Sequence, residues 1–555
     1  MPQPLAYLDP NLPEGARVVL PLLEPPSEFE AKAYYWSFPS QPRLLGRTSS
    51  GTTPWWRLSQ PENDDTIQFG PYAGLETATM CGPVGTHAIH ACWWSSTLPR
   101  VRTALASIPW TSIDVLRIGR TEVRKRDRPV IVWVGVSPSR VLPWPQIASA
   151  LRAVRQALDA DGLFNVQCEM RQSEVIKAAG TGPRLVSPQA ISTAVGQPIS
   201  PAHNDTTTGT LGLFLEPASE PGKKRDDDGS AVWALTCHHV ALPTAASRTG
   251  PPTSMLLPTA ATLNSALVKI NRVIATHQEI IDESRSSALL RPSQATVQAS
   301  KATVDRSLQL RDALRSFQES GEARIVGPVH HSPPIAVKFS EGKYRYTSDW
   351  ALVTLDRAKF PVGYKFDNVV DLQTNTNIDV LCQLVNDHIS SFGGRPKSRF
   401  EPPKGNIFRL RGIVPRQEML GGRPAHDLVA NHDGDPHLIV LKRGFTTELT
   451  AGVVLDIESV TRQFAGGVGS ESTEITVVHL SGQRKYKGEL SKFSARGDSG
   501  AAVFDLRGRI VGMMTGGSGG EDKIDTSYVT YFDFLRREIG QQLKTPVRAC
   551  ESGPA

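Results

Sequence analysis

Hydrophobic and polar residues follow two different patterns along the chain. In the first part, "RPVIVWVGV" at 128–136 is an unbroken apolar run rich in β-branched residues, which predicts a buried strand. Apolar residues then recur at helical spacing between 147 and 158, and Gly162 is a typical helix stop. "FNVQCEMRQSEVIKA" supplies a second strand. This strand–helix–strand order predicts an α+β domain over residues 1–180, whose role the pattern does not indicate.

Residues 181–208 break this periodicity. They are rich in Ala, Gly, Pro, Ser and Thr. Such a composition is typical of a linker, or of an extended segment that lies over the next domain.

From residue 209 the pattern changes to short apolar runs separated by turn residues, such as "TGTLGLFLE", "SAVWALTCHHV" and "YTSDWALVTLD". Further runs of this kind fill 400–540. At about 258–320, two long segments instead place apolar residues on one helical face, which predicts an inserted helical hairpin. The pattern predicts an all-β domain of two successive β-barrels over 209–545, with this insertion.

Composition fits a protein of several domains. The chain has 555 residues, 39% hydrophobic and 21% charged, with no run of about 18 apolar residues that would span a membrane. Its first residues lack the basic and apolar regions of a secretory signal. The six cysteines are scattered, so we expect free thiols, an intracellular and cytoplasmic location, and no membrane partner.

The formal net charge of +6 is mild for a chain of this length. The strongest basic cluster is "RIGRTEVRKRDR" at 117–128. A solvated loop or strand edge is the favoured interpretation, so we do not expect a nucleic acid partner. The alternative, contact with nucleic acid, would show binding that falls steeply with salt.

The stretch "ARGDSGAAVFD" carries the clearest candidate chemistry. A serine hydroxyl is a poor nucleophile unless an adjacent base takes its proton, and acyl transfer also needs N–H groups aimed at the developing oxyanion. Gly497 lets the backbone turn so that the N–H groups of Gly497 and Ser499 point the same way. Gly500 leaves room for a substrate.

This stretch resembles the active-site motif of trypsin-like (chymotrypsin-fold) serine proteases, of the intracellular or microbial type. In that family the base lies in a Thr-x-x-His setting before the serine, and residues 236–239 match it. The orienting aspartate lies between the two, and Asp349 in "DWALV" matches. The resemblance implies a catalytic triad of His239, Asp349 and Ser499, with an oxyanion hole formed by the N–H groups of Gly497 and Ser499.

It further implies a serine endopeptidase that acts on a protein or peptide through an acyl-enzyme and needs neither metal nor cofactor. The chain order His, Asp, Ser is that of this family. The helical insertion accounts for the long separation of His239 and Asp349. The neighbouring His238 is the alternative base, but adjacent residues near a strand end face opposite sides, so we expect it to point away.

A fourth similarity is "LKRGFTTELTAGVV" at 441–454, which resembles a hairpin early in the second barrel of many such proteases, with Glu448 in place of the expected Gly. Secreted members are activated when a new Ile-Val-Gly-Gly terminus pairs with the aspartate before the serine. Cutting at Ile325 or Ile510, which begin the Ile-Val-Gly stretches here, would split the catalytic unit. We therefore expect Asp498 to be held by other hydrogen bonds.

The resemblance also indicates a substrate pocket. Phe493, six residues before the serine, would form its floor, with Ser494 beside it and Thr515, Gly516 and Gly517 as its wall. No acidic residue is present at the floor, so we expect small or medium apolar side chains at the cleavage point and not Arg or Lys.

Two further expectations remain open. The first is that the chain, as an endopeptidase, cleaves itself within 178–208. This expectation rests on the composition of that segment alone. The alternative is a catalytically silent binding or scaffold protein built on a protease fold. Intact serine, histidine and aspartate residues argue against the alternative.

Overall fold

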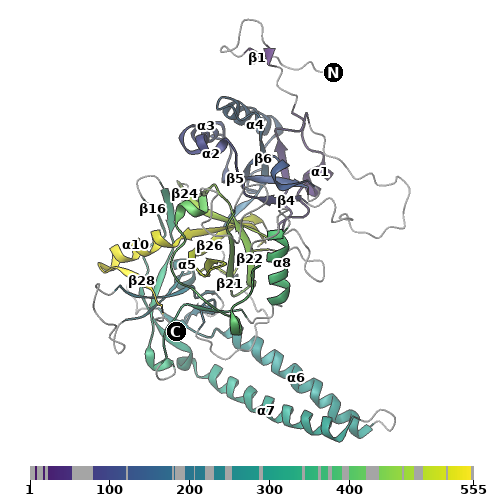
Figure 1. Ribbon diagram of the computed structural model, residues 1–555, viewed down its shortest axis with the longest axis vertical. Coiled ribbons are helices and arrows are strands. Elements are labelled where there is room, and N and C mark those ends of the chain that lie inside the picture. The colour runs from purple at the N-terminus through teal and green to yellow at the C-terminus, as the bar shows by residue number, and fades with distance from the viewer. Residues whose placement is uncertain are drawn as a thin grey trace.

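A computed structural model describes residues 7–8, 17–18, 23–52, 79–120, 123–177, 180–181, 194–204, 207–218, 231–243, 253–286, 292–340, 344–360, 364–372, 378–390, 399–420, 437–465, 468–480, 492–520 and 523–551. These residues form a mixed structure of helices and many strands, and the strands make up five sheets (Figure 1). Within this part of the chain, no helix combines the length and apolar character needed to cross a membrane.

The predicted strand–helix–strand unit is confirmed. β6 (Val130–Val136) and β7 (Val166–Gln172) pair in parallel, and α4 (Trp144–Asp159) connects them. Around this unit lie β1 (Tyr7–Leu8), β2 (Arg17–Val18), α1 (Glu28–Ala33), β3 (Leu44–Arg47), β4 (Thr79–Gly82), α2 (Ile89–Cys92), a π-helical turn (Trp93–Thr97), α3 (Leu98–Ala104), β5 (Trp110–Arg120) and a 3-10 turn (Lys125–Asp127).

A nine-stranded sheet follows. In spatial order it contains β28 (Val547–Ala549), β12 (Leu213–Pro217), β13 (Trp233–Thr236), β18 (Ala351–Thr354), β15 (Ile325–His331), β14 (Ser254–Leu256), β10 (Pro198–Pro201), β11 (Thr207–Thr210) and β9 (Gly180–Thr181). β10 lies within the stretch 181–208, and all four of its residues are buried. The described residues of that stretch therefore include a buried strand of this sheet.

The predicted helical insertion is confirmed as α6 (Ala260–Ser286) and α7 (Gln294–Glu319). Ser293 caps α7 by accepting a hydrogen bond from the Thr296 backbone N–H. Figure 1 shows the two helices side by side, projecting away from the sheets.

Two short hairpins and several helices complete the middle of the chain. They are a 3-10 turn (Gly321–Arg324), β16 (Ala336–Ser340) with β17 (Tyr344–Ser348), a 3-10 turn (Arg357–Lys359), β19 (Val369–Asp371) with β20 (Ile407–Arg409), α8 (Ile378–Ser390), a 3-10 turn (Lys404–Asn406) and α9 (Arg416–Leu420). The pattern analysis did not predict α8, although Leu381, Val385 and Ile389 are buried on one of its faces.

The largest sheet has thirteen strands. Its C-terminal members are β21 (Ile439–Gly444), β22 (Glu448–Val454), β23 (Ser459–Ala465), β24 (Val468–His479), β25 (Ala502–Asp505), β26 (Ile510–Gly520) and β27 (Lys523–Tyr531). A pairing between β22 and β24 closes β22, β21, β25, β26, β27 and β24 into a ring. β23 then pairs with β5, so the sheet continues through β6 and β7 to β3.

The regions predicted as separate domains, 1–180 and 209–545, therefore share hydrogen-bonded strands. Besides the β23–β5 pairing, β8 (Glu174–Lys177) pairs with β26. Two clusters of buried apolar side chains lie among the described residues, and the smaller one, which includes Trp110, Val132 and Leu151, lies around β5, β6 and α4.

One predicted strand is wrong in its second half. "SYVTYFDFL" continues past β27 into α10 (Phe532–Leu543). Phe532, Leu535 and Ile539 are buried at helical spacing, and this longer period decides the structure.

Candidate active site

Ser499 lies in a tight turn just before β25. Gly497 and Gly500 on either side have φ angles of +100° and +96°, in the left-handed region that favours glycine. A Cβ on Gly497 would lie 2.2 Å from Thr446 Oγ1, and one on Gly500 would lie 2.1 Å from the Thr210 carbonyl oxygen. Both glycines are therefore required for this turn to pack where it does.

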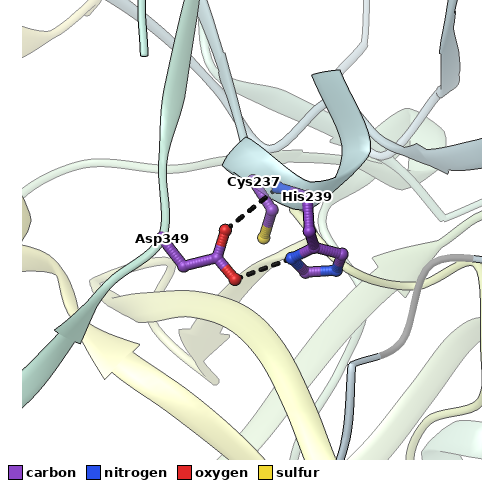
Figure 2. A group of neighbouring side chains, drawn as sticks. All are labelled: Cys237, His239 and Asp349. Carbon is purple, nitrogen blue, oxygen red and sulfur yellow. Dashed lines mark hydrogen bonds and ion pairs between the residues drawn. The ribbon is translucent and has the colours of Figure 1, made fainter. Parts of the chain in front are cut away.

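His239 lies in α5 (His238–Ala241), a single helical turn that follows β13. Its Nε2 is 2.9 Å from Ser499 Oγ, and its Nδ1 is 2.6 Å from Asp349 Oδ2. The His239 backbone N–H also donates to Asp349 Oδ1 at 3.2 Å. Figure 2 shows the Asp349 carboxylate facing His239 through both contacts. The structure thus brings the three predicted side chains into one hydrogen-bonded chain.

Asp349 lies between β17 and β18, and the C-terminal helix fixes the residues on either side of it. Glu538 of α10 accepts hydrogen bonds from Ser348 Oγ at 2.6 Å and from Trp350 Nε1 at 3.0 Å. Burial alone would raise the pKa of Asp349, but the electrostatic interaction with His239 and the hydrogen bonds from it lower that pKa below its ordinary value. Asp349 is therefore held as a carboxylate.

His238 does not contact Ser499. Its Nδ1 lies 2.8 Å from Ser332 Oγ, and burial lowers the pKa of His238. The prediction that His238 points away from the serine because adjacent residues of a strand face opposite sides gave the wrong reason. The two histidines belong to a helical turn and not to a strand. Successive side chains in a helix point about 100° apart, which is enough to direct only His239 at the serine.

Cys237 lies beside this group, and its Sγ is within 4.8 Å of ligand atoms of His239 and Asp349 (Figure 2). The thiol hydrogen bonds to the Met514 carbonyl oxygen at 3.4 Å, and burial raises the pKa of Cys237 well above its ordinary value. A metal would require the thiolate and would have to break the 2.6 Å contact between His239 and Asp349. The donor set therefore fits a hydrogen-bonded network better than a metal site.

The turn before Ser499 is fixed through Asp498, which is fully buried. Asp498 accepts hydrogen bonds from the backbone N–H groups of Thr446 at 2.8 Å, Thr447 at 3.1 Å and Ala495 at 2.9 Å. Its Oδ2 also forms an ion pair with Lys442 Nζ at 3.3 Å, and both side chains are fully buried. The expectation that hydrogen bonds within the chain hold Asp498 is confirmed, while the Lys442 ion pair was not predicted.

Thr210 at the end of β11 is a second residue that the pattern analysis missed. Its hydroxyl donates to the Gly497 carbonyl oxygen at 2.9 Å, and its backbone N–H donates to the Ser499 carbonyl oxygen at 2.7 Å. It thereby fixes the peptide group before Asp498 and the peptide group after Ser499. The only signal in the sequence is the position of Thr210 near the start of the predicted strand "TGTLGLFLE", which the structure divides into β11 and β12.

The five predicted pocket residues divide into two groups. Phe493 is buried, its carbonyl oxygen accepts from Thr450 Oγ1 at 2.7 Å, and Ser494 Oγ lies 2.6 Å from Ser527 Oγ. Thr515 and Gly516 instead line a cavity together with Asp349. Gly516 and Gly517 pair with β8, opposite Lys177 and Ile176.

The basic cluster 117–128 is partly used inside the protein. Arg117 donates to the Val84 carbonyl oxygen at 2.7 Å and to the Arg128 carbonyl oxygen at 2.5 Å. Arg124 pairs with Asp127 at 2.6 Å. These contacts supply structural roles for several of its cations.

No model of a known protein family matches the chain, and no curated protein sequence matches it. The geometry of the residues themselves therefore carries the functional interpretation.

Proposed function

We propose that the chain is a serine endopeptidase that hydrolyses peptide bonds through Ser499, His239 and Asp349. The observation that carries the proposal is the imidazole of His239, which lies 2.9 Å from the Ser499 hydroxyl and 2.6 Å from the Asp349 carboxylate. An imidazole in this position can take the hydroxyl proton at Nε2 while the carboxylate holds its Nδ1–H.

In the proposed reaction, Ser499 Oγ attacks the carbonyl carbon of a peptide bond, and His239 accepts the hydroxyl proton. His239 then donates this proton to the leaving amine, which leaves an acyl group on Ser499. A water molecule attacks the acyl carbon while His239 takes a proton from it, and the serine hydroxyl is restored. The Asp349 carboxylate stabilises the imidazolium in both steps.

Oxyanion stabilisation is assigned to the backbone N–H groups of Gly497 and Ser499. Within the described part of the chain, neither N–H donates a hydrogen bond to a protein acceptor. The carbonyl groups of the same two residues accept from Thr210, which fixes the orientation of the turn. Two fixed N–H donors beside a nucleophile are what an oxyanion intermediate needs.

The proposal includes a trypsin-like architecture of two β-barrels. The closed ring of β22, β21, β25, β26, β27 and β24 would be the second barrel, and strands of the nine-stranded sheet would form the first. The nine-stranded sheet carries His239 and Asp349 next to β13 and β18, whereas Ser499 precedes β25 of the ring. The three side chains thus come from both sheets and meet in one hydrogen-bonded chain.

We further propose that the substrate is a protein or peptide with a small or medium apolar side chain at the cleavage point. Phe493 is buried beneath Gly452, where a Cβ on Gly452 would lie 2.7 Å from its ring. A bulky apolar floor without an acid disfavours Arg and Lys. All six cysteines lie in the described part of the chain and none forms a disulfide, which supports a reducing compartment.

A fluorophosphonate probe, which reacts with activated serines, tests the proposal. We expect labelling of Ser499 that is lost in Ser499→Ala, and labelling slowed by several orders of magnitude in His239→Ala, because the base is needed to activate the hydroxyl. The neighbouring His238→Ala is the matched control and should label within about threefold of the wild type, because His238 contacts Ser332 instead. Labelling that survives in both Ser499→Ala and His239→Ala would contradict the proposal.

A catalytically silent binding protein is the second candidate. One observation favours it: Ser499 is fully buried, and β8 from the N-terminal part of the chain lies along β26 beside it. This candidate predicts that Ser499 stays unlabelled even after β8 has been displaced.

A further inference from the structure

One edge of β26 is shared by three segments in series. β27 pairs along the opposite edge. On the shared edge, β25 pairs with residues 510–513, and the turn that carries Ser499 comes next, where Ser499 Oγ donates to the Thr515 carbonyl oxygen at 3.1 Å. β8 then pairs with residues 516–519. Ser499 therefore lies between β25 and β8 along this edge.

β8 lies on this edge as a bound peptide would. The two strands are antiparallel, with Glu174 opposite Gly519 and Lys177 opposite Gly516. In the described part of the chain, β8 pairs with no other strand. Its carboxyl end points toward Ser499, which is the direction that an acylating peptide needs, because the serine bonds to the last carbonyl group of the bound segment. Addition of a strand to a sheet edge is a common mode of peptide binding.

The fit between β8 and β26 is close. A Cβ on Gly516 would lie 2.5 Å from the Ile176 carbonyl oxygen, so a side chain at this position would displace the strand. Ile176 is only 7% exposed, and Lys177 lines a cavity that Asp349 also lines. Burial raises the pKa of Asp349, while the charge of His239 and then that of Lys177 lower it. β8 thus fills the space beside the nucleophile, within electrostatic reach of the triad.

The N-terminal α+β region holds β8 in this position. Only Ser173 separates β7 from β8. The Ser173 backbone N–H donates to the Val136 carbonyl oxygen at 2.9 Å, and its carbonyl oxygen accepts from Thr111 Oγ1 at 2.9 Å. Arg171 of β7 is fully buried, and its Nη2 donates to Ser518 Oγ at 3.0 Å. These contacts join β7 to β26 beside the start of β8, so they set its register.

We propose that β8 is a built-in competitive inhibitor of Ser499, and that the N-terminal α+β region is an inhibitory domain that holds β8 in the place of a substrate peptide. This inference rests on the proposed function and deepens it, because it assigns the regulation of that same site. Ser499 is fully buried with β8 in place. Activity toward a peptide therefore requires β8 to leave residues 516–519.

Inhibition by β8 is distinct from self-cleavage. Positions 178, 179, 182–193 and 205–206 of the expected self-cleavage segment 178–208 lie outside the described residues, so that expectation stays a prediction. β8 ends at Lys177, before all of these positions. Its pairing with β26 blocks the edge whether or not the chain is cut further along.

The sequence of β8 indicates which peptides the free edge would bind. A competitive inhibitor shares the chemistry of the ligand whose place it takes. β8 offers an extended backbone, a branched apolar side chain opposite Gly517 and a cation opposite Gly516, next to the cavity that the Asp349 carboxylate lines. We therefore expect the edge to prefer extended peptides with a branched apolar residue followed by Lys or Arg at these two positions.

A fluorescein-labelled peptide that copies residues 173–177 tests whether β8 blocks this edge. Its binding is measured by fluorescence anisotropy with full-length chains that carry Ser499→Ala, so that no peptide is cut. Ile176→Asp places a charge at a buried position and should release β8, so the peptide should bind this variant at least tenfold more tightly than its parent. Ile176→Val keeps the strand and is the matched control, which should bind the peptide as weakly as the parent.

Lys177→Asp is a second way to release β8, for use if thermal unfolding shows that Ile176→Asp does not fold. Lys177 is half-buried, so a charge there costs less. The new carboxylate would repel that of Asp349 across the cavity that both line. The same gain in peptide binding is expected. Equal binding by Ile176→Val and by a folded releasing variant would overturn the inference.

Gly516→Ala shows whether the peptide binds at this edge or elsewhere. Its Cβ conflicts with the backbone of any strand that lies where β8 lies. Added to the Ile176→Asp chain, it should weaken peptide binding at least tenfold, although β8 is already released. A peptide with Glu in place of its Lys should bind at least threefold more weakly than the original. Binding that is unchanged by Gly516→Ala would also overturn the inference.

Fluorophosphonate labelling of chains that keep Ser499 makes failure of this inference distinguishable from failure of the proposed function. Ile176→Asp should label at least tenfold faster than the wild type, and Ile176→Val within twofold of it. Equal labelling rates in all three, without a gain in peptide binding, would overturn the inhibitory role and leave the endopeptidase proposal intact. A gain in peptide binding without any labelling of Ser499 would support β8 as the blocking strand and contradict the proposed function.

Discussion

The contact between Lys442 and Asp498 illustrates how single residues determine the geometry of the site. Both side chains are fully buried, and moving two charges out of water carries a free-energy cost that their attraction recovers only with good geometry and further hydrogen bonds. Here three backbone N–H groups and one hydroxyl also bind Asp498. The result is a fixed carboxylate directly before Ser499, which orients the turn that supplies the oxyanion donors. Lys442 is in our view a positioning residue.

Replacing this ammonium should therefore affect both the site and the stability of the fold. We expect Lys442→Met to lower the free energy of unfolding by about 3–5 kcal/mol, because it leaves Asp498 buried without its partner, and to slow fluorophosphonate labelling of Ser499 at least 100-fold. Thermal unfolding and labelling rates measure the two effects.

Leu158→Ala is the matched control for Lys442→Met. It removes a buried side chain of α4 in the smaller apolar cluster and should cost a similar 2–5 kcal/mol. Its labelling rate should nevertheless stay near that of the wild type. Equal losses of labelling in both variants would show that Lys442 acts only through general stability.

The residue scale also shows what the sequence could predict. Ser499, His239 and Asp349 are recognisable because each lies in a short local motif, and the structure brings them together. Lys442 and Thr210 carry no such local signal. Their roles depend on contacts across more than 50 positions, and only the folded chain makes these contacts.

Among the elements, the β21–β22 hairpin resolves a doubt that the sequence raised. Glu448 occupies the position at which the similar hairpin of trypsin-like proteases has glycine. Its φ angle is +56°, in the left-handed region. The turn therefore keeps the backbone conformation that glycine would adopt, at the strain that a side chain adds there. The Glu448 carbonyl oxygen accepts a hydrogen bond from Lys442 Nζ at 3.3 Å, so the turn also supports the buried ion pair between Lys442 and Asp498.

Glu448→Gly should relieve this strain. We expect the free energy of unfolding to rise by about 0.5–1 kcal/mol, since the relief of about 1–2 kcal/mol exceeds the added freedom of the unfolded chain. The thermal midpoint measures it, and labelling of Ser499 should be unchanged. Glu448→Ala, which keeps a Cβ and the strain, is the control. A lower midpoint for the glycine variant than for the alanine variant would contradict this account.

Helices and strands differ in how well the pattern predicted them. α4, α6 and α7 were predicted because their apolar residues repeat over several turns. α5 was expected as a strand end, because a single helical turn is too short for any period to show. Such a turn is nevertheless what directs His239 toward Ser499.

At the scale of the whole molecule, buried acids set how stability depends on pH. Burial raises the pKa of Glu474 to about 7, although hydrogen bonds from Thr347 and Ser472 oppose the shift. The folded chain therefore favours the neutral acid, while the unfolded chain has its ordinary pKa of 4.5. The stabilisation is fully present below pH 4.5 and is lost as the pH rises through about 7.

Glu474→Gln should remove this dependence. The free energy of unfolding of the wild type should fall relative to the variant by on the order of 3 kcal/mol between pH 4.5 and pH 8, because each unit of pKa difference is worth about 1.4 kcal/mol. Thermal midpoints of both proteins at several pH values measure it. Glu471→Gln on the same strand is the control, and parallel curves for wild type and Glu474→Gln would contradict the assignment.

The arrangement of the whole chain was predicted least completely. The sequence separates an α+β region from a strand-rich region because their hydrophobic periods differ. It gives no sign that β5 pairs with β23, or that Arg171 lies fully buried between Asp114 and Asp525 at 3.4 and 3.7 Å. The β5–β23 pairing and the contact of Arg171 with Asp525 join segments more than 300 residues apart, and local periodicity carries no information on which strand edges meet.

The continuous sheet has a practical consequence. The hydrogen bonds between β5 and β23, and the contacts of Arg171 with Ser518 and Asp525, do not depend on an intact backbone after Lys177. A chain cut once after Lys177 would migrate as one particle on a native gel and would separate into two pieces only in denaturant. Purification by size would therefore not reveal the backbone cut, and an affinity tag on either piece would recover both pieces.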